Sequence, residues 1–227
     1  MKELAPKYNL CPRLQGLEDP AATARFAVEE LEKLYPQAPC ALEYAGDPFR
    51  LLVMARLSAQ CTDKRVNQVA KDLFFHYPDA ASMAAAPLSH LEQLVKSCGV
   101  YKVKAKNLKD MAQRLTQETG GRVIPDREYL LSLPGVGPKI ANLILGDVFG
   151  IPGIVADTHC IRLANRLGLV YSDDPRKVEK ALSVQIPPEK QSDFCHRAVL
   201  FGRDVCHSQN PKCANCPLAQ AQKGATL

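Results

Sequence analysis

The chain has 227 residues, of which 46% are hydrophobic and 23% are charged. These shares match ordinary globular proteins and exclude a disordered chain or a coiled-coil rod, and no apolar run approaches the ~20 residues of a membrane span. The net charge of +5 permits a polyanionic partner, whereas 6% aromatic residues without tryptophan disfavour stacking on single-stranded bases. Because the N-terminus carries no apolar export signal, we expect a cytoplasmic protein whose nine cysteines are reduced thiols or metal ligands.

Helical periodicity defines the predicted elements of the first hundred residues. One helix is expected over 22–35. Thr62 can cap a second helix that Pro78 stops, because apolar residues recur between them at helical spacing. Ser89 and Glu92 form a capping-box pattern ahead of the next apolar stripe.

The middle of the chain continues this pattern. Gly120 and Gly121 are expected to end a helix whose apolar stripe consists of Leu108, Met111, Ala112 and Leu115. Asp126 can start a short helix. Pro138 suits the first turn of a helix that ends before Gly150, with an expected buried face of Ile140, Leu143, Ile144 and Val148.

The remaining chain is also predicted to be helical. Further helices are expected over 157–167, 175–184 and 191–202. The only extended candidate is the short segment 122–124, so a sheet is not expected. The predicted fold class is all-α.

The segment Leu133-Pro134-Gly135-Val136-Gly137-Pro138-Lys139 lies between two predicted helices. Two glycines two positions apart allow a sharp turn and leave backbone N–H groups uncovered. The helix that begins at Pro138 directs its free N–H groups and its positive dipole end toward the same point, which suits a phosphate. Spacing alone leaves open a second interpretation, a helix corner that needs glycine only for close packing.

Lys139 and Asp157 are candidates for chemistry. The positive end of the helix dipole disfavours the charged form of Lys139, which could therefore act as a neutral amine nucleophile. The alternative is a solvated lysine that touches a phosphate. Asp157 is placed to cap the helix over 157–167. If the chain folds back so that Asp157 lies near an activated amine, its carboxylate could also stabilise a cationic sugar. The sequence leaves open whether Asp157 caps the helix, takes part in the chemistry, or does both.

Four blocks in order carry a family resemblance. The hairpin segment 133–139, followed by Val155-Ala156-Asp157-Thr158-His159, resembles the helix-hairpin-helix, Gly/Pro-rich loop and Asp signature of DNA glycosylases. The blocks Leu57-Ser58-Ala59-Gln60-Cys61-Thr62-Asp63 and Cys98-Gly99-Val100-Tyr101-Lys102-Val103-Lys104-Ala105 are similar to two further blocks of the endonuclease III family. The resemblance covers the chain from about residue 25 to residue 217.

This resemblance implies two α-helical domains with a DNA-binding cleft between them. Residues 38–150 would form a continuous domain that carries the helix-hairpin-helix. Residues 1–37 and 151–227 would together form a second domain, built from both ends of the chain, that carries a cysteine loop. The implied partner is duplex DNA with damaged bases or abasic sites, bound by a monomer associated with the nucleoid and not with a membrane.

The implied activity is that of a bifunctional DNA glycosylase and AP lyase that removes oxidised pyrimidines. The alternatives are a monofunctional adenine-mismatch glycosylase and a non-catalytic helix-hairpin-helix protein. Lys139 argues against the first, because a monofunctional enzyme activates water and needs no amine. Lys139 together with Asp157 argues against the second, because binding alone requires neither residue.

Residue roles follow from the resemblance. Lys139 would attack C1′ and form a Schiff base that drives β-elimination, with Asp157 activating it and stabilising positive charge on the sugar. Gln60 matches the residue that enters the space left by the flipped nucleotide. Val100 stands where the family usually has a leucine wedge, or is a loop-packing residue. The remaining implied DNA-binding residues are Pro134, Gly135, Val136, Gly137 and His159.

Basic residues gather around these blocks. Seven lie within 27 residues: Lys96, Lys102, Lys104, Lys106, Lys109, Arg114 and Arg122. Such a run is usually a solvated face, but this one flanks the expected wedge and hairpin. Contact with phosphates is therefore expected for Lys102 and Lys104.

Three cysteines lie close together near the C-terminal end of the sequence. Cys206, Cys213 and Cys216 match the first three positions of the family pattern C-x6-C-x2-C-x5-C, which binds a [4Fe-4S] cluster, but Gln222 replaces the fourth cysteine. Three interpretations stay open: a cluster with a substitute or open fourth ligand, a zinc site completed by His207, and a metal-free loop. The other six cysteines are expected to be core or surface residues: Cys11, Cys40, Cys61, Cys98, Cys160 and Cys195.

Overall fold

The computed structural model describes residues 19–225, with side chains up to residue 221. Every regular element in this range is a helix, so the all-α prediction is confirmed. The segment 122–124, the only extended candidate, forms no strand. None of the helices described is both long and apolar enough to span a membrane.

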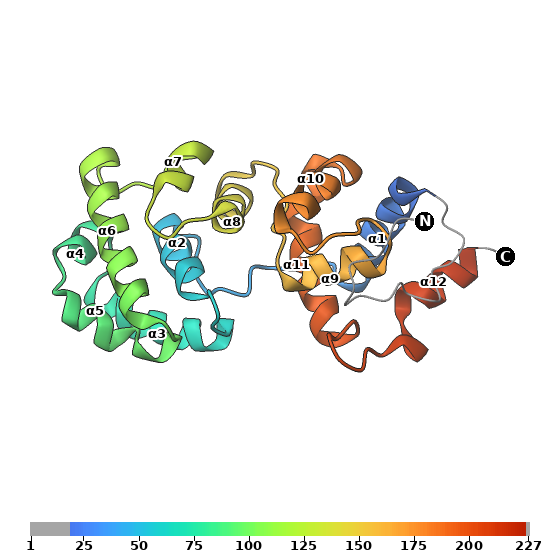
Figure 1. Cartoon of the computed structure of the whole chain (residues 1–227), viewed down its shortest axis with the longest axis horizontal. Helices are drawn as coiled ribbons and strands as arrows, with labels where there is room; N and C mark the ends of the chain where they lie inside the picture. The colour runs from blue at the N-terminus through green and yellow to red at the C-terminus, as the bar shows by residue number, and fades with distance from the viewer. Residues whose placement is uncertain (1–18, 226–227) are drawn as a thin grey trace. The chain divides into compact units, whose positions relative to one another are not determined.

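The chain divides into two compact units, which Figure 1 shows. One is continuous and runs from Cys40 to Ile151. The other combines Met1–Pro39 with Pro152–Leu227, within which residues 19–39 and 152–225 are described. Below, the first is called the continuous unit and the second the two-segment unit.

The continuous unit is a bundle of seven α-helices and one short 3₁₀ helix. These are α2 (Pro48–Leu57), α3 (Asp63–His76), α4 (Ala80–Ala85), α5 (Leu88–Leu94), η1 (Lys96–Cys98), α6 (Tyr101–Thr119), α7 (Arg127–Ser132) and α8 (Pro138–Phe149). The long α6 packs against α4, α5 and α2, and α8 packs against α2 and α7 (Figure 1). Leu51, Leu52 and Leu57 on α2 are fully buried, so α2 lies at the centre of this core.

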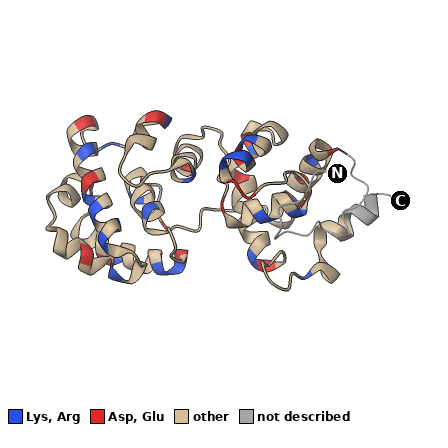
Figure 2. Cartoon of the chain, viewed as in Figure 1, with Lys and Arg blue, Asp and Glu red and all other residues tan. Residues whose placement is uncertain are grey.

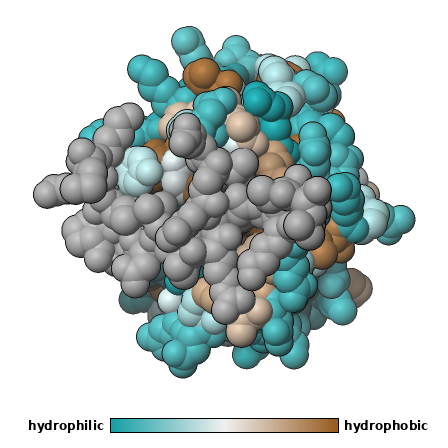
Figure 3. Space-filling view, turned by 90° about the vertical axis from the view of Figure 1, so that its right-hand side faces the viewer, coloured by the Kyte–Doolittle hydropathy of each residue, from teal (hydrophilic) through white to brown (hydrophobic). Residues whose placement is uncertain are grey.

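In the two-segment unit, α1 joins helices from the end of the chain. Its described elements are α1 (Pro20–Leu34), α9 (Thr158–Arg166), α10 (Pro175–Gln185), η2 (Pro188–Lys190), α11 (Gln191–Asp204), η3 (Cys213–Asn215) and α12 (Pro217–Ala225). α1 packs against α10, α11 and α12, and α9 packs against α10 and α11. In the face of the molecule shown in Figure 3, hydrophilic residues cover most of the coloured surface.

Several predicted helix ends are confirmed with their caps. The Thr62 side chain accepts a hydrogen bond from the N–H of Arg65 at the start of α3, and Asp126 caps α7 by accepting from Tyr129. Gly120 ends α6 in the left-handed conformation. The helix predicted over 22–35 is α1, which begins two residues earlier behind the N-cap Asp19.

One local prediction is wrong and another holds only in part. Ser89 and Glu92 form no capping box, because α5 begins at Leu88 behind Pro87 and Ser89 already lies in its first turn. The predicted buried face of α8 holds only in part, since Ile144 is buried, whereas Ile140, Leu143 and Val148 are partly buried and pack against the edge of the core. This helix is apolar almost all round, so its periodicity does not select one face.

Candidate active site

The hairpin joins α7 to α8 in the continuous unit. The N–H of Val136 donates to the carbonyl of Leu133 at 3.1 Å and closes the turn. Gly137 is the N-cap of α8, and Pro138 is its first residue. Among the described residues, the N–H groups of Gly135, Gly137 and Lys139 donate to no protein acceptor. The hairpin therefore presents three free donors beside the positive end of a helix, as an anion site requires.

The two hairpin glycines serve different purposes. Gly135 has φ +80°, and a Cβ there would collide with the Arg56 side chain and lie 2.8 Å from Oδ1 of Asn107. Arg56 donates to that same oxygen from Nε (3.1 Å) and Nη2 (2.8 Å), so it supports the hairpin from α2, and its partial burial lowers its pKa. A Cβ on Gly137 would meet nothing within 4 Å. Close packing thus explains Gly135 but not Gly137.

We expect Gly135→Ala to destabilise the fold and Gly137→Ala to leave it nearly unchanged. An alanine at φ +80° costs about 1–2 kcal/mol in the backbone alone and also displaces Arg56 from Asn107. At Gly137, φ is −106° and the space is open, so the cost should stay below about 1 kcal/mol. Urea denaturation of both variants measures the difference. Equal loss of stability in both would contradict this division.

Lys139 lies at the second position of α8 and is exposed. Among the described residues, its side chain has no hydrogen-bond or ion-pair partner. The ammonium group is therefore free to approach a ligand that sits on the hairpin. This placement agrees with its expected position at a helix N-terminus.

Asp157 is the N-cap of α9 in the two-segment unit. Its Oδ1 accepts a 2.7 Å hydrogen bond from the N–H of Cys160, which confirms the predicted cap. One carboxylate oxygen can make this bond while the other faces elsewhere. Capping therefore does not exclude a catalytic role.

His159 follows on the first turn of α9. Its Nδ1 lies 3.0 Å from a guanidinium nitrogen of Arg162, and the ring packs so closely on Gly202 of α11 that a Cβ there would collide with it. Arg162 also donates to the carbonyls of Gly202 and Cys206. The imidazole is thus held by its own unit, and its contact with DNA stays a prediction.

Gln60 and Val100 both occupy exposed turns with left-handed backbones. φ is +54° at Gln60, between α2 and α3, and +44° at Val100, just before α6. A β-branched residue rarely adopts this conformation, so Val100 is strained. The residue is 59% exposed, which disagrees with the alternative of a loop-packing residue. Val103, one turn later, is also exposed.

The basic run divides into residues with different surroundings. Figure 2 shows Lys and Arg along α6. Lys102 is exposed and has no partner among the described residues, whereas Lys106 pairs with Asp110 and Arg114 with Glu118. Lys104 is buried, and its Nζ donates to main-chain carbonyls, so the expected phosphate contact of Lys104 does not fit the structure. Lys102 keeps that prediction.

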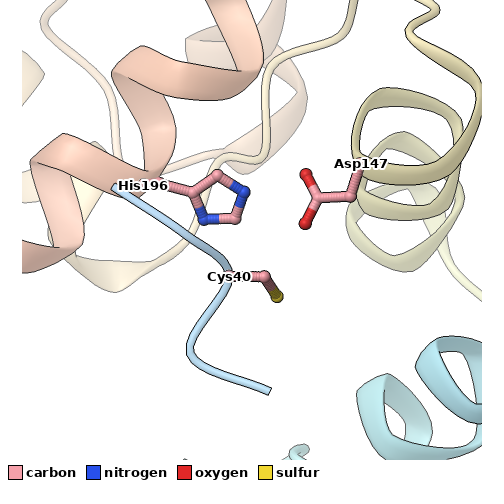
Figure 4. Close-up of side chains that lie close together, drawn as sticks. All are labelled: Cys40, Asp147 and His196. Carbon is pink, nitrogen blue, oxygen red and sulfur yellow. The ribbon is translucent and has the colours of Figure 1, made fainter. Parts of the chain in front are cut away.

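Two cysteines of the continuous unit have weakened acidity. Burial, together with its neighbour Cys61, raises the pKa of Cys98 to about 11. Burial raises the pKa of Cys40 to about 12, and Asp147, shown near it in Figure 4, adds to that rise. Cys160 and Cys195 of the other unit are buried, and Cys11 lies outside the described residues. Neither Cys40 nor Cys98 is therefore favoured as a nucleophile by its surroundings.

The cysteine loop, which carries Cys206, Cys213 and Cys216, is held against α9 by hydrogen bonds from Arg166. Arg166 donates to Sγ of Cys206 (3.1 Å) and to the carbonyls of His207 and Ser208. The sulfurs of Cys206, Cys213 and Cys216 are not gathered within 4.8 Å of one another among the residues described. Ligands of one tetrahedral zinc lie about 3.8 Å apart, given Zn–S bonds of about 2.3 Å. The arrangement therefore disfavours the zinc interpretation.

Sequence reasoning missed four supporting residues. Arg56 and Asn107 hold the hairpin, and Arg162 and Arg166 hold the start of the cysteine loop. The pair Arg162 and Arg166 gives a weak signal, because a spacing of four places both on one side of α9. Arg56 and Asn107 are far apart in sequence and give no signal before the packing of α2, α6 and the hairpin is known.

Comparison with known proteins gives consistent matches. Residues 53–188 match the family described as HhH-GPD superfamily base excision DNA repair protein. The chain is 42% identical over 194 residues to Endonuclease III of Bacillus subtilis, which covers 85% of this chain and 88% of that protein. It is 43% identical over 190 residues to Endonuclease III of Synechocystis, covering 83% and 86%. A solved trapped Endonuclease III–DNA covalent intermediate, an estranged-adenine complex, has TM-score 0.83 and 40% identity, covering 89% of this chain and 98% of that one.

Proposed function

Because the chain belongs to the endonuclease III family of HhH-GPD superfamily base excision DNA repair proteins, we propose that it removes oxidised pyrimidines from duplex DNA through Lys139. The chain is a base-excision repair enzyme, a bifunctional DNA glycosylase and AP lyase, and its partner is damaged duplex DNA. A monofunctional adenine glycosylase and a non-catalytic binding protein are not favoured. We also propose that the protein acts as a monomer.

The observation that carries the proposal is the hairpin with its free donors. Three unpaired N–H groups offer a phosphate a site, and the unpartnered side chain of Lys139 starts from the same loop. A phosphate held there would place the adjoining sugar within reach of the amine. Pro134, Gly135, Val136 and Gly137 are proposed to contact DNA at the hairpin. His159, in the other unit, is also proposed as a DNA contact.

The proposed chemistry uses Lys139 as nucleophile. Its Nζ, as the neutral amine, attacks C1′ while the bond to the damaged base breaks and the base leaves with the bonding electrons and a proton. The C1′–O4′ bond then breaks, O4′ takes up a proton, and the protonated Schiff base that forms between Nζ and C1′ makes the C2′ hydrogen acidic. Loss of that hydrogen expels the 3′ phosphate by β-elimination. Asp157 assists by taking a proton from the amine and by stabilising positive charge on the sugar.

Two exposed turns are proposed to open the duplex. Gln60 enters the space that the flipped nucleotide leaves, and Val100 acts as the wedge. Both side chains are exposed on strained turns, which is common for residues that meet a ligand. Lys102, exposed and unpartnered, is proposed to contact a phosphate nearby.

Borohydride trapping tests this function. The full chain is mixed with duplexes that contain thymine glycol, an abasic site or no damage, and sodium borohydride reduces any Schiff base to a stable adduct. We expect adducts with the first two duplexes and none with the third. Adducts only with the abasic duplex would contradict the proposed lesion class.

A cofactor is proposed for the cysteine loop. Cys206, Cys213 and Cys216 supply three of the four thiolates that a [4Fe-4S] cluster normally binds, and each thiolate of such a cluster binds a different iron. Gln222 offers only an amide, so the fourth iron would take water, a carboxylate or a small thiol. The cluster would fasten the loop and takes no part in the chemistry at Lys139.

We expect protein purified without oxygen to be brown and to bleach in air. Absorbance near 400 nm, a general property of such clusters, follows the loss, and Gln222→Cys should slow it by supplying the missing thiolate. Iron and sulfide analysis checks the assignment. Anaerobic protein without colour, iron or sulfide would leave a metal-free loop that Arg166 and packing hold.

A further inference from the structure

Lys104 is buried in the continuous unit although it carries a charge. Only 1% of the residue is exposed. Its Nζ donates to the carbonyl oxygens of Leu57 (2.9 Å) and Ala59 (2.7 Å) and to that of Cys98. The three hydrogens of the ammonium group thus have three acceptors. Burial lowers the pKa of this lysine, so the group is retained at an energetic cost.

The three carbonyls belong to the two turns that expose Gln60 and Val100. Leu57 is the last residue of α2, and Ala59 directly precedes Gln60. Cys98 ends η1, two residues before Val100. The ammonium group therefore links the two turns through their main chains.

Both turns are strained at the residue that they expose. Left-handed φ values of +54° and +44° are unfavourable for residues other than glycine. Such conformations persist where the surroundings hold them. Gln60 and Val100 are exposed and do not pack in the core. The backbone conformation that the turns hold therefore sets the direction of their side chains.

A simple capping role does not account for all three bonds. A positive group at the end of α2 is favourable and satisfies the carbonyl of Leu57. The bonds to Ala59 and Cys98 lie beyond that helix and serve the turns.

We propose that Lys104 is a positioning residue that holds the Gln60 turn and the Val100 turn in a fixed relation, so that both side chains enter the duplex together. This inference rests on the proposed roles of Gln60 and Val100. Loss of the ammonium group should slow the displacement of a paired nucleotide. It should not slow the chemistry on a sugar that is already out of a stack.

The test compares Lys104→Met with Lys109→Met in the full chain. Lys109 is a matched control, because it lies on the same helix and donates to the carbonyl of Ala86, outside both turns. One substrate is a duplex with thymine glycol beside 2-aminopurine, whose fluorescence reports unstacking. The other is a single strand with an abasic site, where no base has to be displaced and borohydride trapping reports the chemistry.

We expect Lys104→Met to slow the fluorescence change and excision by about tenfold to a hundredfold, as a small misplacement of contacting groups does. Trapping on the single strand should keep the wild-type rate, and Lys109→Met should match wild type on both substrates. Equal losses on both substrates, or unchanged fluorescence kinetics, would overturn the proposal. Wild-type protein that traps on neither substrate would instead contradict the proposed function.

A second variant decides the question if Lys104→Met does not fold. Lys104→Arg keeps the charge, but a planar guanidinium cannot direct three N–H groups from one atom. We expect faster alkylation of Cys98, which is 1% exposed, read by mass spectrometry of its peptide, together with slower unstacking. Wild-type alkylation and unstacking in Lys104→Arg would overturn the proposal.

Discussion

Lys139→Gln should abolish the borohydride-trapped adduct while lesion binding persists. Glutamine has nearly the length of lysine but no amine that can form a Schiff base. Lys139 is exposed and has no partner among the described residues, so its replacement should not disturb the fold. One exposed charge contributes about 1 kcal/mol or less, so affinity should fall by less than about tenfold. Trapping and binding are measured on the same duplex with an abasic site.

Lys71→Gln is the matched control for this experiment. Lys71 is an exposed lysine on α3 that also has no partner among the residues described, so the two variants lose the same charge. Lys71→Gln should trap at the wild-type rate. Undiminished trapping by Lys139→Gln would place the nucleophile elsewhere, and loss of binding together with trapping would assign Lys139 a phosphate contact instead.

The sequence predicted the helices best where a cap and a clear stripe coincide. Thr62 and Asp126 cap α3 and α7 as expected, and Gly120 ends α6. α2 was not predicted, because it is buried nearly all round and shows no alternation that would indicate one face. Pattern alone cannot orient a helix that is apolar on nearly every side, which is also why the buried face of α8 was predicted only in part.

The site was predictable at the level of main-chain motifs and less so at single side chains. The hairpin and the Asp157 cap follow from local sequence. The burial of Lys104 had a signal that was not used, since it precedes Leu108 by four residues and continues the predicted stripe. A lysine that continues an apolar stripe is expected to donate hydrogen bonds to acceptors inside the protein and not to phosphates of a ligand. The support of Gly135 by Arg56 depends on packing between distant segments and had no such signal.

Asp157→Asn should separate the structural role of this residue from its catalytic role. The amide oxygen of asparagine can still accept the hydrogen bond from Cys160, so α9 keeps its cap. Loss of the negative charge beside the helix N-terminus should lower the free energy of unfolding by a few tenths to about 1 kcal/mol. Base excision should nevertheless fall by about two to four orders of magnitude, since asparagine neither accepts a proton nor balances a cationic sugar. Single-turnover excision and urea denaturation of the same preparation measure both effects.

Asp79→Asn provides the control for the cap itself. Asp79 caps α4 with the same bond to the third residue of its helix, at 2.8 Å compared with 2.7 Å for Asp157. Both variants should lose similar stability, because both replace a carboxylate at a helix N-terminus by an amide. Only Asp157→Asn should lose excision, because only that carboxylate is proposed to act on the sugar. Loss of excision that tracks the loss of stability in both variants would reduce Asp157 to a helix cap, and the stabilisation of positive charge would then have to come from another group.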